Sequence, residues 1–400
     1  MIDFEARRVI EALRSGVPSR TVGQYFSSAR QDVLSLLSRR LADTSESGIS
    51  GGMIVTGKYG EGKTHLLNTV FNMAQAANMV VSLISLGKET PLDKLYLVYQ
   101  KIVQNTYLPQ HLQPGFLDAL SNITPHSPIA EEMTAYTAKS LTSDKLFYLF
   151  RAYLYTNDPE EKHMLLADLE GDFIGNLVLR QIYKKIFAEK CAFNTTFSKT
   201  KHMGDYFAML SHLFLQLGYD GWVILFDETE LTGRLGKKTR LNAYKNMAAF
   251  LFPSDYSLLQ STFSLFTVTD SYVEEVIERK HEYENLNEAA FEPKDAEAAR
   301  RSLDAIESAV QLKPLNKNEV FQIIEKLTEF YKNAYDWRPN ISLPDLYASA
   351  DNRGYLLRTR IRAVVECLDQ LYQYNQMGNL RIDELGAMNY EEDIPELPIE

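Results

Sequence analysis

One eight-residue segment constrains what this chain can fold into more than any other part of its sequence. Residues 57–64 read GKYGEGKT and match the pattern G-x-x-x-x-G-K-[ST]. A short apolar, β-branched run at 53–56 precedes the segment, and the pattern of residues 64–77 is typical of a helix. Because a second apolar strand is expected at 79–86, this order predicts an α/β fold with parallel strands.

The spacing of the motif suits the binding of a phosphate group. Glycines allow backbone conformations that turn successive N–H groups toward an anion, and the positive end of the following helix adds to the attraction. Lys63 can then reach the β- and γ-phosphates, and the Thr64 hydroxyl can complete the shell of a Mg²⁺ ion. We therefore predict that the chain binds ATP with Mg²⁺. The residues expected to line the nucleotide are Gly57, Lys58, Tyr59, Gly60, Glu61, Gly62, Lys63, Thr64 and His65.

A chance match in a flexible loop is the alternative, and the strand and helix patterns on either side of the motif argue against it.

Lys63 is expected to act on the phosphates during catalysis as well as in binding. His65 follows Thr64 on the predicted helix and is expected to pack or to make a polar contact rather than to catalyse.

A pair of acids follows another predicted strand. The apolar run 222–226 ends at Asp227 and Glu228, as in the Walker B arrangement of P-loop proteins. Asp227 would hold Mg²⁺ through water beside Thr64, and Glu228 would orient and deprotonate the attacking water. The alternative is a strand that simply stops in a polar turn. Glu230 is a third acid nearby. It could support the site residues or lie at an interface, and a solvated position is at least as good an interpretation.

The next predicted strand, 263–268, offers a hydroxyl group for the γ-phosphate or the attacking water. Thr267 and Thr269 both lie near its end. We favour Thr269 as a catalytic residue, because ligands of open α/β sheets bind at the carboxyl ends of the strands. A threonine that faces solvent is the alternative.

An arginine is also expected near the nucleotide, because a guanidinium can neutralise the charge that develops on the transferring phosphoryl group. Arg353 is the main candidate for this catalytic role and Arg358 is a second; both lie where C-terminal helices could fold over the nucleotide. Arg234 and Arg240 follow the acid pair and could act across a subunit interface. For each of these arginines, a surface salt bridge is the alternative.

The rest of the chain reads as mostly helical. Helices are expected at about 2–14 and 22–41, and the apolar pattern after residue 91 is too long for one helix between adjacent strands. The predicted organisation consists of N-terminal helices at 1–48, an ATPase core at 49–90 and 204–300, a helical insertion at 91–203, a C-terminal helical lid or winged-helix-like domain at 301–390, and an acidic tail at 391–400.

Composition argues against several classes of protein. The formal net charge of −11 argues against a uniformly basic nucleic-acid coat, although a local basic patch is compatible with the 42 lysines and arginines. Cys191 and Cys367 are far apart, so neither a disulfide framework nor a cysteine metal site is expected. We find no run of about 18 apolar residues and no apolar signal core, so we expect no membrane span and a cytoplasmic location.

Several segments together resemble a known family. They are residues 9–18, the motif at 57–64, the stretch 218–230, Arg240 with Tyr244, and residues 312–315. Through these segments the chain resembles the ATP-binding proteins of BREX-type phage-defence loci, the BrxD-like group, over most of its length and least at 110–200. More broadly, its layout is similar to that of AAA+ and origin-recognition-type ATPases, which combine a P loop, a Walker B acid pair, a sensor strand and a C-terminal helical lid.

The resemblance implies an α/β P-loop NTPase core of the AAA+/ASCE kind, with helical insertions and a C-terminal helical domain. It assigns Lys63, Thr64, Asp227 and Glu228 their roles in ATP binding, Mg²⁺ binding and hydrolysis. Residues 351–353 resemble the lid sensor motif, except that an aspartate stands where a glycine is usual two residues before the arginine. The resemblance also implies a role in defence against phage, often beside a helicase-like partner and on DNA.

Two functions follow from these patterns. The first is an ATP-hydrolysing motor or switch in a defence complex, for which Glu228 is the discriminating residue, because a catalytic base implies turnover. The second is a nucleotide-gated module that recruits DNA or a helicase-like partner with little hydrolysis, through the acidic tail and the helical insertion. A small-molecule kinase is a weaker third, since no pocket of substrate-binding acids is evident. The patterns leave open whether the chain forms a homo-oligomer.

Overall fold

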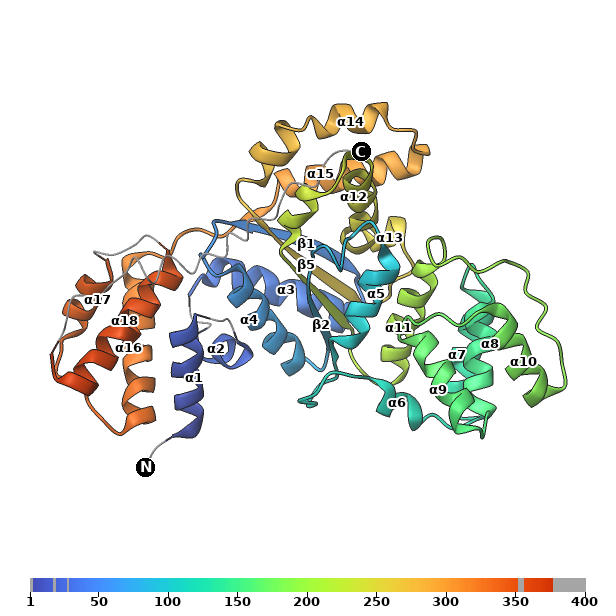
Figure 1. Ribbon diagram of the computed structural model, residues 1–400, viewed down its shortest axis with the longest axis horizontal. Helices are drawn as coiled ribbons and strands as arrows, with labels where there is room; N and C mark the ends of the chain where they lie inside the picture. The colour runs from blue at the N-terminus through green and yellow to red at the C-terminus, as the bar shows by residue number, and fades with distance from the viewer. Residues whose placement is uncertain (1–2, 17–18, 27–28, 352–355, 377–400) are drawn as a thin grey trace. The chain divides into compact units, whose positions relative to one another are not determined.

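The computed structural model describes residues 3–16, 19–26, 29–351 and 356–376, and the chain divides into two units (Figure 1). The helical unit comprises Met1–Arg30, Tyr59–Asn68 and Lys313–Glu400, and the sheet unit comprises Gln31–Lys58 and Thr69–Leu312. No helix within the described ranges has the length and apolar character that a membrane crossing requires.

A six-stranded sheet forms the centre of the sheet unit, with the strand order β3-β2-β4-β5-β1-β6. The strands are β1 (Gly51–Gly57), β2 (Val80–Ser85), β3 (Thr106–Tyr107), β4 (Trp222–Asp227), β5 (Thr262–Thr269) and β6 (Val310–Gln311). All run parallel to their neighbours except β3, which is antiparallel to β2 at the edge. The predicted α/β fold and its four longer strands are confirmed, and the expected sensor strand β5 lies between β1 and β4.

The strands β3 and β6 lie in segments that we expected to form helices and loops. Each has two residues, too few for a pattern of alternation to appear in the sequence. Contacts with distant parts of the chain hold them in place. The Leu312 N–H beside β6 donates to the Thr56 carbonyl at 2.7 Å, and the Gln75 side chain donates to the Tyr107 carbonyl of β3 at 3.0 Å. Both strands therefore form because their backbones pair with residues distant in the sequence, and not because their own residues strongly favour a strand.

The central strand β4 is buried along its whole length, as expected for a strand covered on both faces. Phe226 stacks on Phe266 of β5 with the ring centroids 4.2 Å apart, and the Trp222 indole N–H donates to Ser82 of β2 at 2.9 Å. This packing fixes the end of the strand that carries the acid pair.

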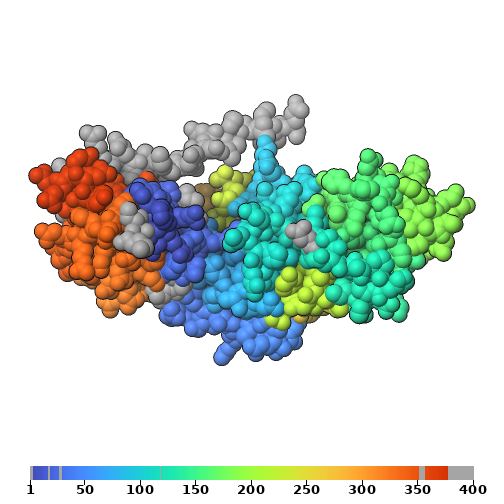
Figure 2. Space-filling model, turned by 90° about the horizontal axis from the view of Figure 1, so that it is seen from below, coloured from blue at the N-terminus to red at the C-terminus, as the bar shows by residue number. Residues whose placement is uncertain are grey.

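Helices make up most of the remaining sheet unit. Around the sheet are α3 (Gln31–Ser47), α4 (Lys63–Ala76, whose first residues count with the helical unit), α5 (Leu95–Gln104), α6 (Leu117–Ser121), α11 (Met203–Gln216), the 3₁₀ helix η1 (Thr229–Arg234), α12 (Lys237–Leu251), α13 (Pro253–Tyr256), the π-helix η2 (Val273–Glu278), α14 (Glu282–Glu288) and α15 (Pro293–Glu307). A separate group consists of α7 (Pro128–Lys139), α8 (Lys145–Tyr155), α9 (Pro159–Leu169) and α10 (Asn176–Phe187). Figure 1 shows this group beside α11, and in Figure 2 its teal and green atoms form one continuous surface.

The helical unit joins helices from both ends of the chain. It contains α1 (Phe4–Ser15), α2 (Arg20–Tyr25), α16 (Lys317–Tyr335), α17 (Leu343–Asp351) and α18 (Leu357–Tyr374). The helix α1 packs against α16 and α18 through the buried side chains of Val9 and Ile10. Arg14 donates to both carboxylate oxygens of Asp369, at 2.8 and 2.7 Å. The N-terminal helix therefore shares one core with the C-terminal helices.

The single helix predicted at 22–41 is wrong, because the structure contains two helices there, α2 and α3. Phe26 departs from helical geometry with φ −106° and ψ 35°, and Arg30 has φ +60°. A residue other than glycine in the left-handed region does not continue a right-handed helix. The apolar residues keep their helical spacing across residues 26–30, so the sequence pattern does not reveal the break between the two helices.

A buried ion pair joins α8 to α9. The Nζ atom of Lys145 lies 2.6 Å from an oxygen of Asp168, and neither side chain is more than 1% exposed. The other oxygen of Asp168 accepts a hydrogen bond from the Tyr206 hydroxyl at 2.6 Å, and the ammonium lies 4.2 Å from the ring centroid of Phe197. Burial lowers the pKa of Lys145, and the charge of Asp168 opposes that shift.

Replacing Asp168 by asparagine is expected to lower the free energy of unfolding by about 3 kcal/mol at neutral pH. The variant keeps the shape of the side chain but leaves Lys145 without a counter-charge, so folding has to remove the lysine proton. The unfolded chain then binds one more proton than the folded chain, and the stability of the variant should rise as the pH approaches the ordinary pKa of lysine. Denaturant unfolding at two pH values measures both effects, with the exposed Glu160→Gln as control. An equal loss at both pH values would contradict this account.

Candidate nucleotide-binding site

The predicted phosphate loop lies between β1 and α4. β1 ends at Gly57, and α4 begins at Lys63, which is buried. Gly60 and Gly62 have φ angles of +76° and +96°, in the left-handed region that favours glycine. Residues in this conformation turn neighbouring N–H groups to one side of a loop, as a phosphate cradle requires.

The other residues of the motif differ in their surroundings. Lys58 and Tyr59 are exposed, whereas Glu61 is buried. Thr64 is the second residue of α4, and its carbonyl oxygen accepts a hydrogen bond from the side chain of Asn68 at 3.0 Å. The Leu66 N–H donates to the Gly62 carbonyl at 2.9 Å, so α4 starts with a regular helical turn, whose positive end favours an anion.

His65 makes a polar contact with the end of α2. Its Nε2 atom lies 3.0 Å from the carbonyl oxygen of Phe26, which can only accept a hydrogen bond, so the ring carries a hydrogen on Nε2. Burial lowers the pKa of His65 and keeps the ring neutral. The histidine thereby ties the first turn of α4 to α2.

A residue outside the motif also contacts the loop. Arg30 stands 31 positions before Glu61, and its Nη2 atom donates to the Glu61 carbonyl oxygen at 2.6 Å. The sequence does not reveal this contact, because the acceptor belongs to the backbone and leaves no trace in a residue pattern.

At the end of β4, Asp227 is held by two donors. Its Oδ1 atom accepts a hydrogen bond from the Thr267 hydroxyl at 2.7 Å and another from the Glu228 N–H at 3.0 Å. Asp227 is 6% exposed and Thr267 is fully buried. The carboxylate is thus fixed in orientation by the neighbouring strand β5.

The two threonines near the end of β5 differ in a hydrogen bond. Both pair with β1 in the sheet register, Thr267 with Val55 and Thr269 with Gly57, but the hydroxyl of Thr267 also reaches Asp227 of β4. We favoured Thr269 from the sequence, and its catalytic role stays a prediction. Residues two apart on a strand point to the same face, so the sequence alone could not separate the two.

Replacing Thr267 by valine is expected to reduce ATP hydrolysis about tenfold, because it removes one hydrogen bond to a carboxylate without changing the volume of the side chain. The effect should be largest at low Mg²⁺ concentration if Asp227 holds the ion. Initial rates at several Mg²⁺ concentrations measure it. Thr267→Ser retains the hydroxyl and is the matched control. Identical rates for the valine and serine variants would contradict the prediction.

Glu228 follows Asp227 with φ 57° and ψ 36°, a left-handed conformation that turns the chain into η1. The residue as a whole is exposed, but neighbouring protein atoms surround its carboxyl group closely enough to raise its pKa. The charge of Asp227 adds to this rise, and Arg234 at the end of η1 opposes it. A raised pKa suits a general base that works near neutral pH.

The candidate arginines lie in different environments. Arg240 is buried, and its Nε atom donates to Glu282 at 2.7 Å. Arg234 is exposed. Arg358 is exposed and lies over the ring of Tyr59, 5.8 Å from its centroid. The main candidate, Arg353, lies outside the described residues.

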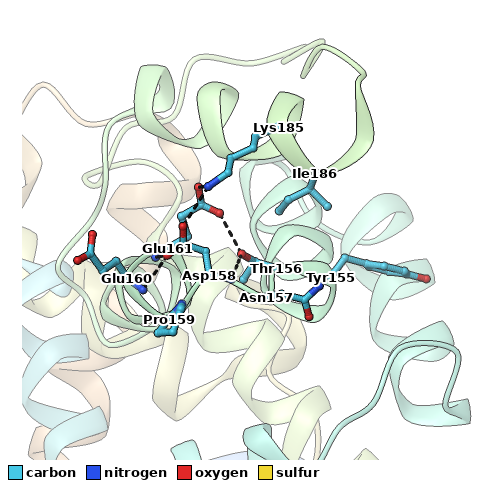
Figure 3. A pocket seen from close by; sticks show the side chains of 9 residues that line it. All are labelled: Tyr155, Thr156, Asn157, Asp158, Pro159, Glu160, Glu161, Lys185 and Ile186. Atoms are coloured by element: carbon cyan, nitrogen blue, oxygen red, sulfur yellow. Dashed lines mark hydrogen bonds and ion pairs between the residues drawn. The ribbon is translucent and has the colours of Figure 1, made fainter.

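A cavity of about 890 Å³ lies at the corner between α8 and α9 and contains none of the predicted site residues. Figure 3 shows Asp158, Glu160 and Glu161 in its lining, with Lys185 as the basic partner. Lys185 lies 3.0 Å from Asp158 and 2.7 Å from Glu161. With three acids to one lysine, this cavity would repel a triphosphate, and the lysine is already paired with two of the acids.

The donors suited to a metal ion are few. Within the part of the chain that the structure describes, no three or more histidine, cysteine or acidic side chains gather around a common point. A Mg²⁺ ion does not require such a cluster, since proteins usually bind it through one or two carboxylates together with substrate phosphates and water.

Comparison with known proteins identifies one family. The sequence model of the family described as BREX system ATP-binding protein BrxC/D matches residues 3–124 and 189–382. The unmatched stretch between them contains α7 to α10. No curated protein matches the sequence. A similar solved structure is the Orc1 protein of Aeropyrum pernix in complex with DNA, at 12% identity and a TM-score of 0.36. The match covers 90% of this chain and 64% of the length of that one.

Proposed function

The chain belongs to the family of BREX system ATP-binding proteins BrxC/D, and on this premise we propose that it binds ATP with Mg²⁺ and hydrolyses the ATP. One observation carries the proposal. β5 lies between β1, which leads into the glycine-rich loop, and β4, which ends at the acid pair. The carboxyl ends of these parallel strands share one edge of the sheet, where ligands of open α/β sheets bind.

In this proposal the backbone of residues 57–65 surrounds the phosphates, and the Lys63 ammonium neutralises the β- and γ-phosphates. The Thr64 hydroxyl and the Asp227 carboxylate would hold Mg²⁺, and both oxygen donors fit that ion. Bound there, the ion would offset negative charge on the phosphate oxygens. Thr267 keeps the Asp227 carboxylate in place.

Glu228 would orient the attacking water and accept its proton, and the raised pKa of its carboxyl group supports this role. Thr269 and an arginine of the C-terminal region, Arg353 or Arg358, complete the proposed site. Their contribution is to contact the γ-phosphate and to neutralise the charge that develops on it.

Phosphate release by the wild-type chain tests the proposal, with and without DNA and with EDTA as control. We expect turnover that EDTA abolishes. Tight ATP binding without turnover under any condition would instead support the second function, a nucleotide-gated recruitment module. A chain that neither binds nor hydrolyses ATP would contradict both.

We propose further that ATP turnover drives or gates a phage-defence complex with a helicase-like partner, DNA or other copies of the chain. The family's BREX description supports the setting. For the domain organisation we retain the core at 49–90 and 204–300 and the insertion at 91–203; of the lid expected at 301–390, we assign the part up to residue 312 to the core, because β6 pairs with β1. Co-purification from the native source with mass measurement, with and without ATP, tests this part. A chain that purifies alone in both states would argue against an obligate complex.

A further inference from the structure

We infer that Arg30 is a positioning residue for the nucleotide: it holds the peptide between Glu61 and Gly62 in the orientation that phosphate binding requires. The inference rests on the proposed function, because it assigns a role in the same glycine-rich loop. It adds a residue that lies outside the motif and that contacts the backbone of the loop.

The contact between Arg30 and the loop is direct. The Nη2 atom of Arg30 donates to the Glu61 carbonyl oxygen at 2.6 Å. In a trans peptide the C=O and N–H groups point in opposite directions. Fixing the Glu61 carbonyl toward the guanidinium therefore aims the Gly62 N–H away from the guanidinium.

The peptide needs this restraint because of the residue that follows it. Gly62 has φ +96°, and a glycine can adopt positive and negative φ with similar ease, so nothing intrinsic to the sequence prevents the peptide from flipping. The guanidinium also packs against Gly62, since a Cβ atom added there would lie 3.6 Å from Nη1 of Arg30. A charged donor on the carbonyl polarises the peptide as well, which strengthens its N–H as a donor to phosphate.

Arg30 is itself held by the start of α16. Its backbone N–H donates to Oε1 of Glu319 at 3.0 Å. The other oxygen of Glu319 accepts from the Asn316 N–H at 2.8 Å, and Asn316 Oδ1 accepts from the Glu319 N–H at 3.1 Å, which forms a capping box. Glu319 therefore serves as helix cap and as anchor for an arginine whose φ of +60° is itself unusual.

These contacts form one chain of hydrogen bonds, from the capping box of α16 through Arg30 to the phosphate loop. All of its members lie within the helical unit. A movement of the start of α16 would reach the loop through Arg30. The same chain offers a route by which the C-terminal helices could sense or alter the occupancy of the loop.

Titration of the full-length Arg30→Ala variant with ATP and Mg²⁺ tests the inference. We expect the dissociation constant to rise roughly tenfold or more, since a hydrogen bond to a charged group is lost. Ethylguanidinium ion should restore part of the affinity, and ethylammonium should restore less, because only the former reproduces the planar guanidinium group. A role confined to folding would give no such selective rescue. The exposed Arg39→Ala is the matched control.

Thermal unfolding without nucleotide shows whether the variants fold, and Arg30→Lys provides a milder substitution should the alanine variant fail. Glu319→Ala should weaken ATP binding less than Arg30→Ala, and the exposed Glu325→Ala not at all. If Arg30→Ala and Arg30→Lys bind ATP as tightly as the wild type while Lys63→Ala does not, the inference is overturned and the proposed function stands. If the wild type itself binds no ATP, the proposed function fails first.

Discussion

Replacing Glu228 by glutamine is expected to lower the rate constant of ATP hydrolysis by about 10²- to 10⁴-fold while ATP stays bound. Glutamine has nearly the same shape as glutamate but cannot accept the proton of the attacking water. Single-turnover hydrolysis and ATP titration on the same preparation separate the two effects. The exposed Glu275→Gln in η2 is the matched control.

The wild type should show the same carboxyl group in its pH profile. Burial of the Glu228 carboxyl and the charge of Asp227 raise its pKa, and the base form is the deprotonated one. As the pH is lowered, turnover should therefore decline with a midpoint above the ordinary pKa of a glutamate. The remaining activity of Glu228→Gln should not show this decline. A glutamine variant that turns over at the wild-type rate would remove Glu228 from the mechanism.

Replacing Lys63 by alanine is expected to raise the dissociation constant of ATP roughly a hundredfold, because it deletes a charge-assisted contact with the β- and γ-phosphates. Lys63 is buried at the start of α4, and within a protein a charge acts on a phosphate more strongly than it does in water. Equilibrium titration with ATP measures the loss, and the exposed Lys88→Ala is the control.

The same titration should give a smaller loss for ADP and a still smaller one for adenosine, since these ligands lack the groups that Lys63 is proposed to reach. An equal loss for all three ligands would indicate a damaged loop. Unchanged ATP affinity would place the lysine away from the phosphates.

The sequence predicted those parts of the fold that leave a long local pattern. β4 is an apolar run because both of its faces are buried, and Thr64 opens a regular helical pattern after a glycine-rich loop. The two-residue strands β3 and β6 leave no such pattern and depend on distant partners. The break between α2 and α3 comes from backbone conformation at Phe26 and Arg30, which an apolar stripe does not record.

In the candidate site, too, the features with a local sequence pattern were predicted and the contacts between distant residues were not. Spacing predicted that the motif and the acid pair belong together, because each follows a strand. The contacts that orient them were not predictable from spacing: Thr267 differs from Thr269 by its hydrogen bond to Asp227, which the structure reveals. Arg240 was expected at a surface but is buried against Glu282, which stands 42 positions later.

Calorimetric titration of the intact wild-type chain with ATP, in the presence and absence of Mg²⁺, measures the proposed nucleotide site itself. We expect one saturable ATP site per chain, bound more tightly with Mg²⁺ than without it. A chain that folds, as unfolding experiments can establish, yet takes up no ATP in either condition would contradict the proposed ATP site.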